Sequence, residues 1–239
     1  MKVTVPADLF TAALAACAAH TFQGKDAGYL ATVDLQTNED LELVATASGG
    51  MTTGVARVPL VEFDGTMSRV ALSKQDITTI RSLFCEPLKQ LEVVVRSQTV
   101  APASPDDKPE VIHQMEIREL GSLFGGRSLK LTMPDHGNRD IPKLWHPIAA
   151  ALRRRSMPSI PVTLFHPKNM AAFRASSLAY GEELRIEPAG PDGSLVVHCG
   201  HWFVGLLVAQ AGAPETFTAS RGEWGERLPM KFAVVKDGS

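Results

Sequence analysis

The stretch FHPKNMAAFRASSLAYGEELRIEPAGPDGSLVVHCGHWFVGLLVA, residues 165–209, decides the fold. It opens with His166-Pro167, and proline suits the first turn of a helix because its missing N–H needs no partner there. Apolar residues then recur at helical spacing up to Gly181, a residue type that commonly ends helices. Three runs with strand character follow, separated by turn residues. The stretch therefore predicts a helix followed by three strands.

The same order of elements occurs twice earlier in the chain. MKVTV and ADLFTAALAACAAH predict a strand and a helix, and LATVDLQ, DLELVATA and TTGVARVPL predict three strands. RVALS then predicts a strand, SKQDITTIRSLF a helix with Ser73 as N-cap, and LEVVVRS, EVIHQMEIREL and RSLKLTMP three more strands. Residues 1–134 are thus expected to form one domain from two β-α-β-β-β units, with both helices on one face of a continuous antiparallel sheet.

Residues 135–239 are expected to form a second, abbreviated domain. HGNRDIP is a polar joint, KLWHPIAAALRRR (residues 143–155) predicts a third helix, and IPVTLF predicts a strand that leads into the helix beginning at Pro167. The residues after Ala209 are turn-rich and form an additional tail with one strand-like run, PMKFAVV. The predicted fold class is α+β, with antiparallel sheets outside and helices on one face.

Composition places the chain among ordinary globular proteins. Its 239 residues are 44% hydrophobic and 21% charged, which is enough for one large domain or two small ones. Cys17, Cys85 and Cys199 are far apart and odd in number, so a disulfide framework is not expected and a reducing compartment is. The chain shows no signal peptide and no apolar run of membrane-spanning length. We expect a cytoplasmic protein without a membrane partner, in the host cytoplasm if the source is viral.

Charge is distributed unevenly between the predicted helices and the rest of the chain. The four helices contain eight Lys or Arg and two acids, which leaves sixteen basic and twenty-four acidic residues elsewhere, from totals of 24 and 26. The helices thus carry about +6 and the remainder about −8, although the net charge is only −2. Such segregation lets a positive surface coexist with an acidic exterior. Ordinary solvated helix faces are the alternative explanation.

These patterns resemble the bacterial DNA sliding clamp, the β subunit and processivity factor of DNA polymerase III, in a shortened form. MKVTVPADLFTAALAACAAHTF, LELVATASGG, VALSKQDITTIRSLF, MEIREL and LKLTMPD are similar to a complete middle domain of that family. FHPKNMAAF through WFVGLLVA is similar to its final half-domain. Between Pro134 and Pro161 the family has a further half-domain, where this chain has only the predicted 143–155 helix.

The resemblance implies a non-enzymatic protein that encircles duplex DNA and slides along it. Sliding requires weak contacts to phosphates without sequence preference, because tight base readout would stop it. The implied partners are double-stranded DNA, a DNA polymerase, other proteins with a clamp-binding motif, and a clamp loader. Rings of this superfamily contain six similar domains, so we expect a homo-oligomer, and a trimer in preference to a dimer. No catalytic residue, metal or cofactor is expected.

Two sets of residues are candidates for these contacts. The helices supply the cations predicted to face DNA: Lys74, Arg81, Lys143, Arg153, Arg154, Arg155, Lys168 and Arg174. The resemblance adds Lys25 and Tyr29, which lie in the loop after the first helix. It also implies an outer groove for partner peptides, lined by Leu30, Thr46, Leu206, Leu207 and Val208. For the last three of these residues, a plain core strand is an equally good interpretation.

Two other classes of function remain open from the sequence. One is a monomeric clamp-like interaction module that keeps the groove without forming a ring. The other is an enzyme that uses the region from His198 to His201, because histidine and cysteine are suitable metal ligands. Adjacent residues of a strand point to opposite faces, however, and no second pair lies at ligand spacing. Ser48-Gly49-Gly50 lacks the lysine and helix of a phosphate-binding loop.

Overall fold

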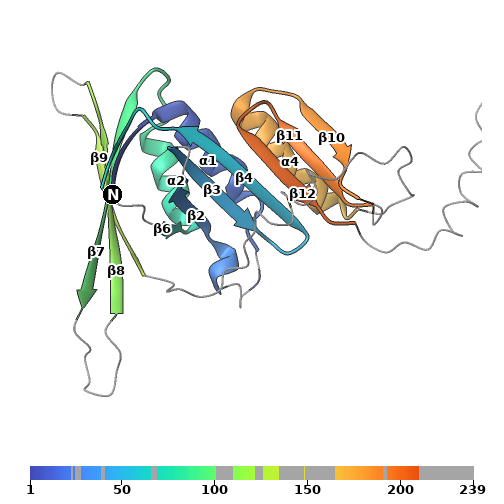
Figure 1. Ribbon diagram of the computed structural model, residues 1–239, viewed down its shortest axis with the longest axis horizontal. Coiled ribbons are helices and arrows are strands. Elements are labelled where there is room, and N and C mark those ends of the chain that lie inside the picture. Colours follow the sequence, from blue (N-terminus) through green and yellow to red (C-terminus); the bar gives the residue numbers. More distant parts are fainter. Residues whose placement is uncertain are drawn as a thin grey trace, which may run out of the picture.

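The computed structural model describes most of the chain up to residue 209. The described residues are 1–22, 24, 28–38, 41–65, 69–100, 110–121, 126–134, 148, 165–190 and 193–209. Within them, two antiparallel sheets cover a layer of helices, and the strands of one sheet stand at the opposite end of the molecule from the last three strands (Figure 1). This arrangement confirms the α+β class with sheets outside and helices on one face.

The first two units have the order of elements that the sequence predicts. The first unit consists of β1 (Lys2–Pro6), α1 (Ala7–Ala18), β2 (Val33–Thr37), β3 (Glu42–Ser48) and β4 (Thr52–Pro59). The second unit consists of β6 (Arg69–Leu72), α2 (Lys74–Leu83), β7 (Gln90–Val100), β8 (Glu110–Glu119) and β9 (Ser128–Pro134). A short 3₁₀ helix, η1 (Gly28–Ala31), precedes β2, and a short strand, β5 (Glu62–Asp64), separates the units.

The two units exchange their first strands. Strand β1 of the first unit pairs with β7 of the second, and β6 of the second pairs with β2 of the first. This reciprocal exchange relates the units by an approximate two-fold axis. It also explains why the strands form two sheets rather than the one continuous sheet expected from sequence: β5-β1-β7-β8-β9 form one, here called sheet A, and β6-β2-β3-β4 belong to the other, sheet B.

A third unit extends sheet B. It consists of α4 (Pro167–Tyr180), β10 (Leu184–Pro188), β11 (Leu195–Cys199) and β12 (Phe203–Leu207). Strand β12 pairs antiparallel with β4, from Phe203 opposite Ala56 to Leu207 opposite Thr52. Sheet B therefore has seven strands in the order β10-β11-β12-β4-β3-β2-β6, and α4 lies beside α1.

Helix α1 is buried because it lies between two other helices and the sheets. Its packed residues include Phe10, Leu14 and Cys17, each 0% exposed. Ala13 and Ala16 are also buried, and such small side chains let neighbouring helices approach closely. The only exposed residue of α1 is Asp8. The alanine-rich sequence of this helix thus suits a central position in the helix layer.

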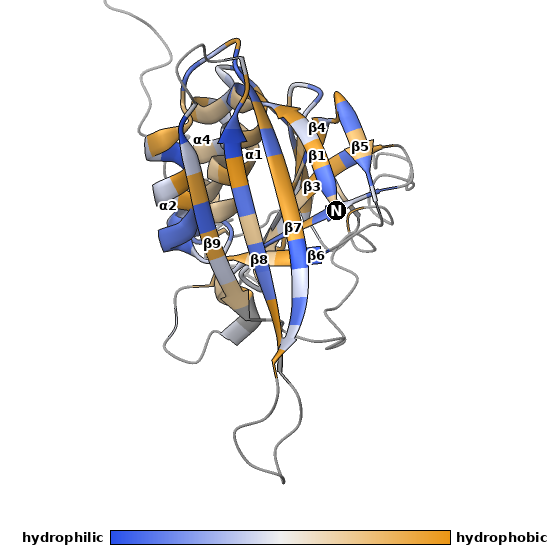
Figure 2. Ribbon diagram, turned by 90° about the vertical axis from the view of Figure 1, so that its left-hand side faces the viewer, coloured by the Kyte–Doolittle hydropathy of each residue, from blue (hydrophilic) through white to orange (hydrophobic). Residues whose placement is uncertain are grey.

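Sheet A shows the alternation that a one-sided core requires. On β7, Leu91, Val93 and Val95 are buried against the helices, while Glu92 and Arg96 lie on the opposite face. The hydropathy of β7 and β8 alternates in the same way along both strands (Figure 2). The apolar face of the sheet therefore covers the helices, and the polar face forms the exterior.

Candidate nucleic-acid interface

The helix layer presents α2, α1 and α4 in a row, and cations come only from the outer two of these. Helix α1 has no Lys or Arg, whereas α2 carries Lys74 and Arg81, and α4 carries Lys168 and Arg174. All four side chains are exposed. The three helices contain four cations and two acids, a net of +2.

One of the two acids is committed to a helix cap. The Asp76 carboxylate accepts hydrogen bonds from the Ser73 backbone N–H (3.0 Å) and from its Oγ (2.7 Å). The Asp76 backbone N–H in turn donates to Ser73 Oγ at 3.2 Å, which completes a capping box. Lys74 and Arg81 on the same helix therefore have no carboxylate partner on it.

Helix α4 is delimited by residues that the sequence predicts. The His166 ring accepts a hydrogen bond from the Lys168 backbone N–H at 3.2 Å, Pro167 occupies the first turn, and Gly181 ends the helix with a φ of 68°. These ends fix the helix register, and with it the exposed positions of Lys168 and Arg174.

Ion pairing separates the cations of the helices from those of the sheets. Among the described residues, the cations that pair with carboxylates are Lys2, Arg57, Arg69, Lys89, Arg118, Arg127, Lys130 and Arg185. None of them lies on a helix. The described Lys and Arg residues without an ion pair are the four on α2 and α4, together with Arg96 on β7. Unpaired positive charge is thus concentrated on the helix layer.

The remaining predicted DNA contacts fall outside what the structure describes. Lys25, Lys143, Arg153, Arg154 and Arg155 are not among the described residues. Tyr29 belongs to η1, of which the backbone is described at this position. The structure therefore brings together four of the ten predicted residues, and the other six stay predictions.

The predicted partner groove divides between two faces of β12. Leu207 is 0% exposed and belongs to the main core with Phe203, on the helix-facing side. Leu206 points the other way and belongs to a separate apolar cluster on the outer face of sheet B, with Val208 packed at its margin. Leu207 thus supports the strand from within, and only Leu206 and Val208 of the three share the outer face.

The outer cluster also contains residues that the sequence-based set missed. Its members are Ile148, Ala189, Val196 and Leu206, with Val55, Val204 and Val208 packed against them. Thr46 pairs across the sheet with Val55 and is 4% exposed. Leu30 is half-buried, and its carbonyl accepts the Phe22 N–H at 2.8 Å. Strict strand alternation applied to β12 would have selected Val204, Leu206 and Val208 together.

A buried histidine that the sequence did not single out lies where the first and third units meet. His20 is 1% exposed, and neither of its ring nitrogens has a hydrogen-bond partner among the described residues. Its ring lies 4.7 Å from the Phe173 ring and 5.6 Å from the Phe203 ring. Burial lowers the pKa of His20 to about 4, so the ring is neutral at pH 7.

Glycines make room for this aromatic cluster. A Cβ atom at Gly54 would lie 2.6 Å from the His20 ring, and one at Gly205 would lie 2.6 Å from the Phe173 ring. A cavity of about 400 Å³ adjoins His20, with Phe22, Met51 and Lys168 among its lining residues. The cluster fastens α4 to the end of α1 and to the β4–β12 strand pair.

The His198–His201 region does not assemble a catalytic site in the described structure. His198 is half-buried on the outer face, whereas Cys199 is buried on the helix-facing side. Burial raises the pKa of the Cys199 thiol, which opposes formation of a nucleophilic thiolate. No group of three or more His, Cys, Asp or Glu residues that could hold a metal ion occurs in the described part of the chain.

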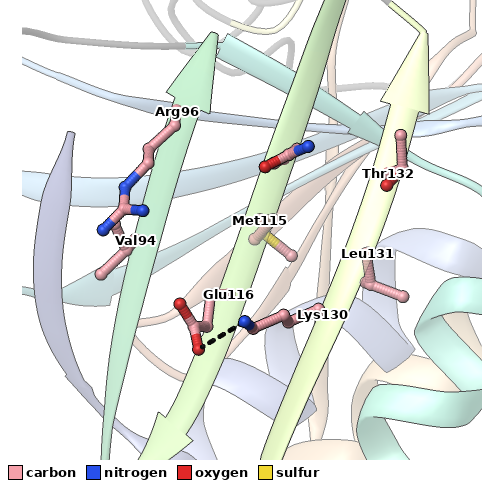
Figure 3. A pocket seen from close by; sticks show the side chains of 8 residues that line it. Val94, Arg96, Met115, Glu116, Lys130, Leu131 and Thr132 are labelled. Carbon is pink, nitrogen blue, oxygen red and sulfur yellow. Dashed lines mark ion pairs between the residues drawn. The ribbon is translucent and has the colours of Figure 1, made fainter. Parts of the chain in front are cut away.

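The outer face of sheet A holds a shallow hollow of about 170 Å³ (Figure 3). Val94, Arg96, Glu116 and Lys130 line it. Glu116 pairs with Lys130 at 3.7 Å and with Arg118 at 2.7 Å. These pairs lower the pKa of Glu116 and leave most of the charge on this face neutralised, unlike that on the helices.

No helix in the ranges that the structure describes is long and apolar enough to cross a membrane.

The structure is similar to solved bacterial sliding clamps. No protein-family model and no curated protein matches the sequence. The DNA polymerase sliding clamp of Caulobacter crescentus matches with a TM-score of 0.57 at 12% identity, covering 91% of this chain and 68% of that chain. The clamp of Bacillus subtilis matches with 0.52 at 12% identity (89% and 65%), and the DNA polymerase III β subunit of Thermotoga maritima with 0.51 at 10% (97% and 68%). The chain thus has a sliding-clamp fold and spans about two thirds of the length of these clamps.

Proposed function

We propose that this protein is a non-enzymatic sliding clamp, a ring of identical chains that encircles duplex DNA and tethers a DNA polymerase. The observation that carries the proposal is the partition of charge. The cations of α2 and α4 lack carboxylate partners, whereas nearly all described cations of the sheets and loops have one. A surface of unpaired Lys and Arg side chains attracts phosphates, and a neutralised exterior does not.

The chemistry of these contacts suits sliding. Lys74, Arg81, Lys168 and Arg174 are long, exposed side chains on the helix surface, which can follow phosphates without reading bases. Each contact is weak and is exchanged readily for a neighbouring phosphate, so the protein moves along DNA while topology prevents its loss. We propose that the other predicted contacts, Lys25, Tyr29, Lys143 and the run from Arg153 to Arg155, extend the same surface.

Partner proteins are proposed to bind on the outer face, where β12 meets β4. A short peptide with apolar anchors would contact Leu206, Val208, Thr46 and Leu30 there, while Leu207 holds the strand in place from the core side. A DNA polymerase, other proteins with a clamp-binding motif, and a clamp loader are the proposed ligands of this surface. A few apolar anchors usually dominate the affinity of such a peptide.

The proposed domain division follows the units. Residues 1–134 form the complete clamp-like domain, and residues 135–239 form the abbreviated second domain together with the tail after Ala209. The proposed location is the cytoplasm, where replicating DNA of a bacterial cell is found. No cofactor or metal takes part in the proposed function.

Topological retention on DNA tests the proposal without a clamp loader. The protein is threaded onto linear duplex DNA through free ends, both ends are then blocked with bound streptavidin, and the complex is washed at high salt. We expect the protein to stay on blocked DNA and to leave once a restriction enzyme releases one end. Equal loss from blocked and open DNA would refute the ring.

A monomeric interaction module is the second candidate, because the chain covers only 65% of the length of the Bacillus subtilis clamp. In that case the outer groove would bind the peptide, but the protein would remain a single chain and would leave blocked and open DNA equally fast. The native mass separates the two candidates before any DNA is added.

A further inference from the structure

One side of the third unit is uncovered in the described structure. Strand β10 pairs with β11 and with no other described strand, so it forms an open edge of sheet B. Three large apolar side chains are exposed on this unit: Met170 (38%), Leu178 (71%) and Ile186 (46%). Met170 and Leu178 lie on α4 with Arg174 between them at helical spacing, and Ile186 lies in the middle of β10. In Figure 1, β10 is the strand of this unit farthest from α1 and α2.

The first two units show what covers this side of a unit. Strand β2 is the first strand after the helix in its unit, and β6 of the sister unit pairs with it. Strand β7 holds the same place in the second unit, and β1 of the first unit pairs with it. Helices α1 and α2 also pack together. In the third unit, β10 and α4 hold these places, and the described chain has no further unit to cover them.

We propose that the α4–β10 side is covered by the α4–β10 side of a second copy of this chain, so that two third units form one composite domain about a two-fold axis. The two units of the first domain are related by an approximate two-fold axis and cover each other through equivalent elements. A unit of this kind is therefore complementary to a copy of itself in the same relative orientation. Such an isologous contact buries the same patch on both chains.

The chemistry of the side fits burial against another protein chain. An open edge strand and exposed apolar side chains are features that soluble proteins usually cover or pair. Arg185 and Glu187, the charged residues of β10, already pair with each other at 2.6 Å. The edge therefore brings no unpaired charge of its own into the contact.

The same counting sets the number of chains in the proposed ring, and this step rests on the proposed function. Strands β4 and β12, each the last of its unit, pair with each other, and β9 is the last strand of the second unit and has no such partner among the described strands. An equivalent contact joins β9 to β9 of another copy. Each chain then supplies three units, and a ring of six two-unit domains takes four chains rather than the three expected from counting domains.

Native mass tests the composite domain without DNA. The double variant Leu178→Glu, Ile186→Lys places charge on both proposed contact elements, and we expect its mass by light scattering to be half that of the parent protein. The matched control is Val61→Glu, which changes a 51%-exposed apolar residue of the first domain and should leave the mass unchanged. Melting curves of both variants confirm folding. An unchanged mass of the double variant, or a monomeric parent protein at tens of micromolar, overturns the proposal.

A symmetric disulfide supplies a second test that does not depend on destabilising the contact. Cys85, the exposed cysteine among the described residues, is first replaced by serine, and Leu178→Cys is added; Val61→Cys in the same background is the control. Mild oxidation should give a covalent dimer of the Leu178 variant alone. A monomer whose introduced thiol resists maleimide would show that the chain's own residues cover this side, and would overturn the proposal. A dimer that forms normally but shows no retention on blocked DNA refutes the clamp function and leaves the composite domain standing.

Discussion

The imidazole ring of His20 lies edge-on to the phenyl ring of Phe173, with 4.7 Å between the ring centroids. His20 follows the end of α1, and Phe173 lies at the centre of α4, so this contact joins the first unit to the third. It connects segments that are far apart in the sequence and that hold the only strand junction between the units in the described structure. Its protonation and its packing therefore give direct measures of how strongly the units are joined.

Protonation of His20 should make the protein less stable in mild acid. In the unfolded chain the pKa is near 6.5, and in the folded protein burial lowers it to about 4. Below pH 6.5 the unfolded state binds a proton that the folded state excludes, so the free energy of unfolding falls as the pH drops from about 6.5 to about 4. The total is on the order of 3 kcal/mol, and above pH 6.5 this group has no effect.

Urea denaturation between pH 7.5 and 4.5 measures this dependence. The control is His20→Gln, which removes the titrating group while other acidic residues titrate as before. We expect the parent protein to lose more stability than the variant over this range. Parallel pH profiles would show that His20 does not stay neutral in the folded state.

Substitution of Gly205 should loosen the junction. A Cβ atom there would lie 2.6 Å from Phe173 Cε1 and 2.7 Å from the carbonyl oxygen of Thr53, and the second neighbour is backbone that cannot rotate away. Gly205→Ala should therefore cost ~1–3 kcal/mol in the free energy of unfolding. Gly50→Ala, in the turn before β4, is a useful contrast, because it meets no atom within 4 Å but has a φ of +88°. A normal melting temperature for Gly205→Ala would contradict the close packing.

Removal of the helix cations should lower the salt dependence of DNA binding. In the variant with Lys74, Arg81, Lys168 and Arg174 changed to alanine, the slope of log affinity against log salt should become shallower by up to about 3.6, at ~0.9 per lost phosphate contact. Titration of labelled duplex at several salt concentrations gives the slope, which should not depend on the DNA sequence. The triple change of Arg153, Arg154 and Arg155 tests the predicted third helix in the same assay.

The matched control removes an equal number of cations from the sheets. Lys2, Lys89, Arg118 and Lys130 pair with carboxylates on β7 and β8, so their replacement by alanine should leave the slope unchanged. If the sheet variant and the helix variant lose the same slope, the DNA does not face the helices.

The two faces of β12 should respond differently to truncation. Leu207→Ala creates a cavity in the main core and should cost ~2–5 kcal/mol in the free energy of unfolding. Val208→Ala lies at the margin of the outer cluster, so it should melt nearly normally and lose ~1 kcal/mol, or roughly fivefold, in affinity for a peptide with a clamp-binding motif. Titration of labelled peptide and a melting curve for each variant separate these effects. Full peptide affinity in Val208→Ala would place the groove elsewhere.

The sequence predicted the repeating units well because their signals are local. The capping box of Ser73 and the glycine stop at Gly181 appear in the structure where the sequence places them. The exchange of β1 and β6 between units was not predictable, since nothing in a strand's own sequence states which meander it joins. That is why one continuous sheet was expected and two were found.

The candidate site was predicted in part for the same reason. Exposed cations on a helix follow from helical periodicity, which gave Lys168 and Arg174 correctly as surface residues. Leu207 was placed in the groove because three apolar residues in a row conceal the alternation of a strand. His20 was overlooked because its partners, Phe173 and Phe203, are more than 150 residues away along the chain. Such a contact exists only once the third unit has packed on the first.

The pairing of β12 with β4 has a consequence for synthesis of the chain. Strand β4 ends at Pro59, and its partner β12 begins only at Phe203, so a ribosome must add more than 140 residues between them. At ~5–20 residues per second, β4 waits roughly 7–30 s as an unprotected edge. During that interval it is a template for pairing with a neighbouring nascent chain. Slow or stalled translation between these strands should therefore favour aggregation on polysomes over completed protein.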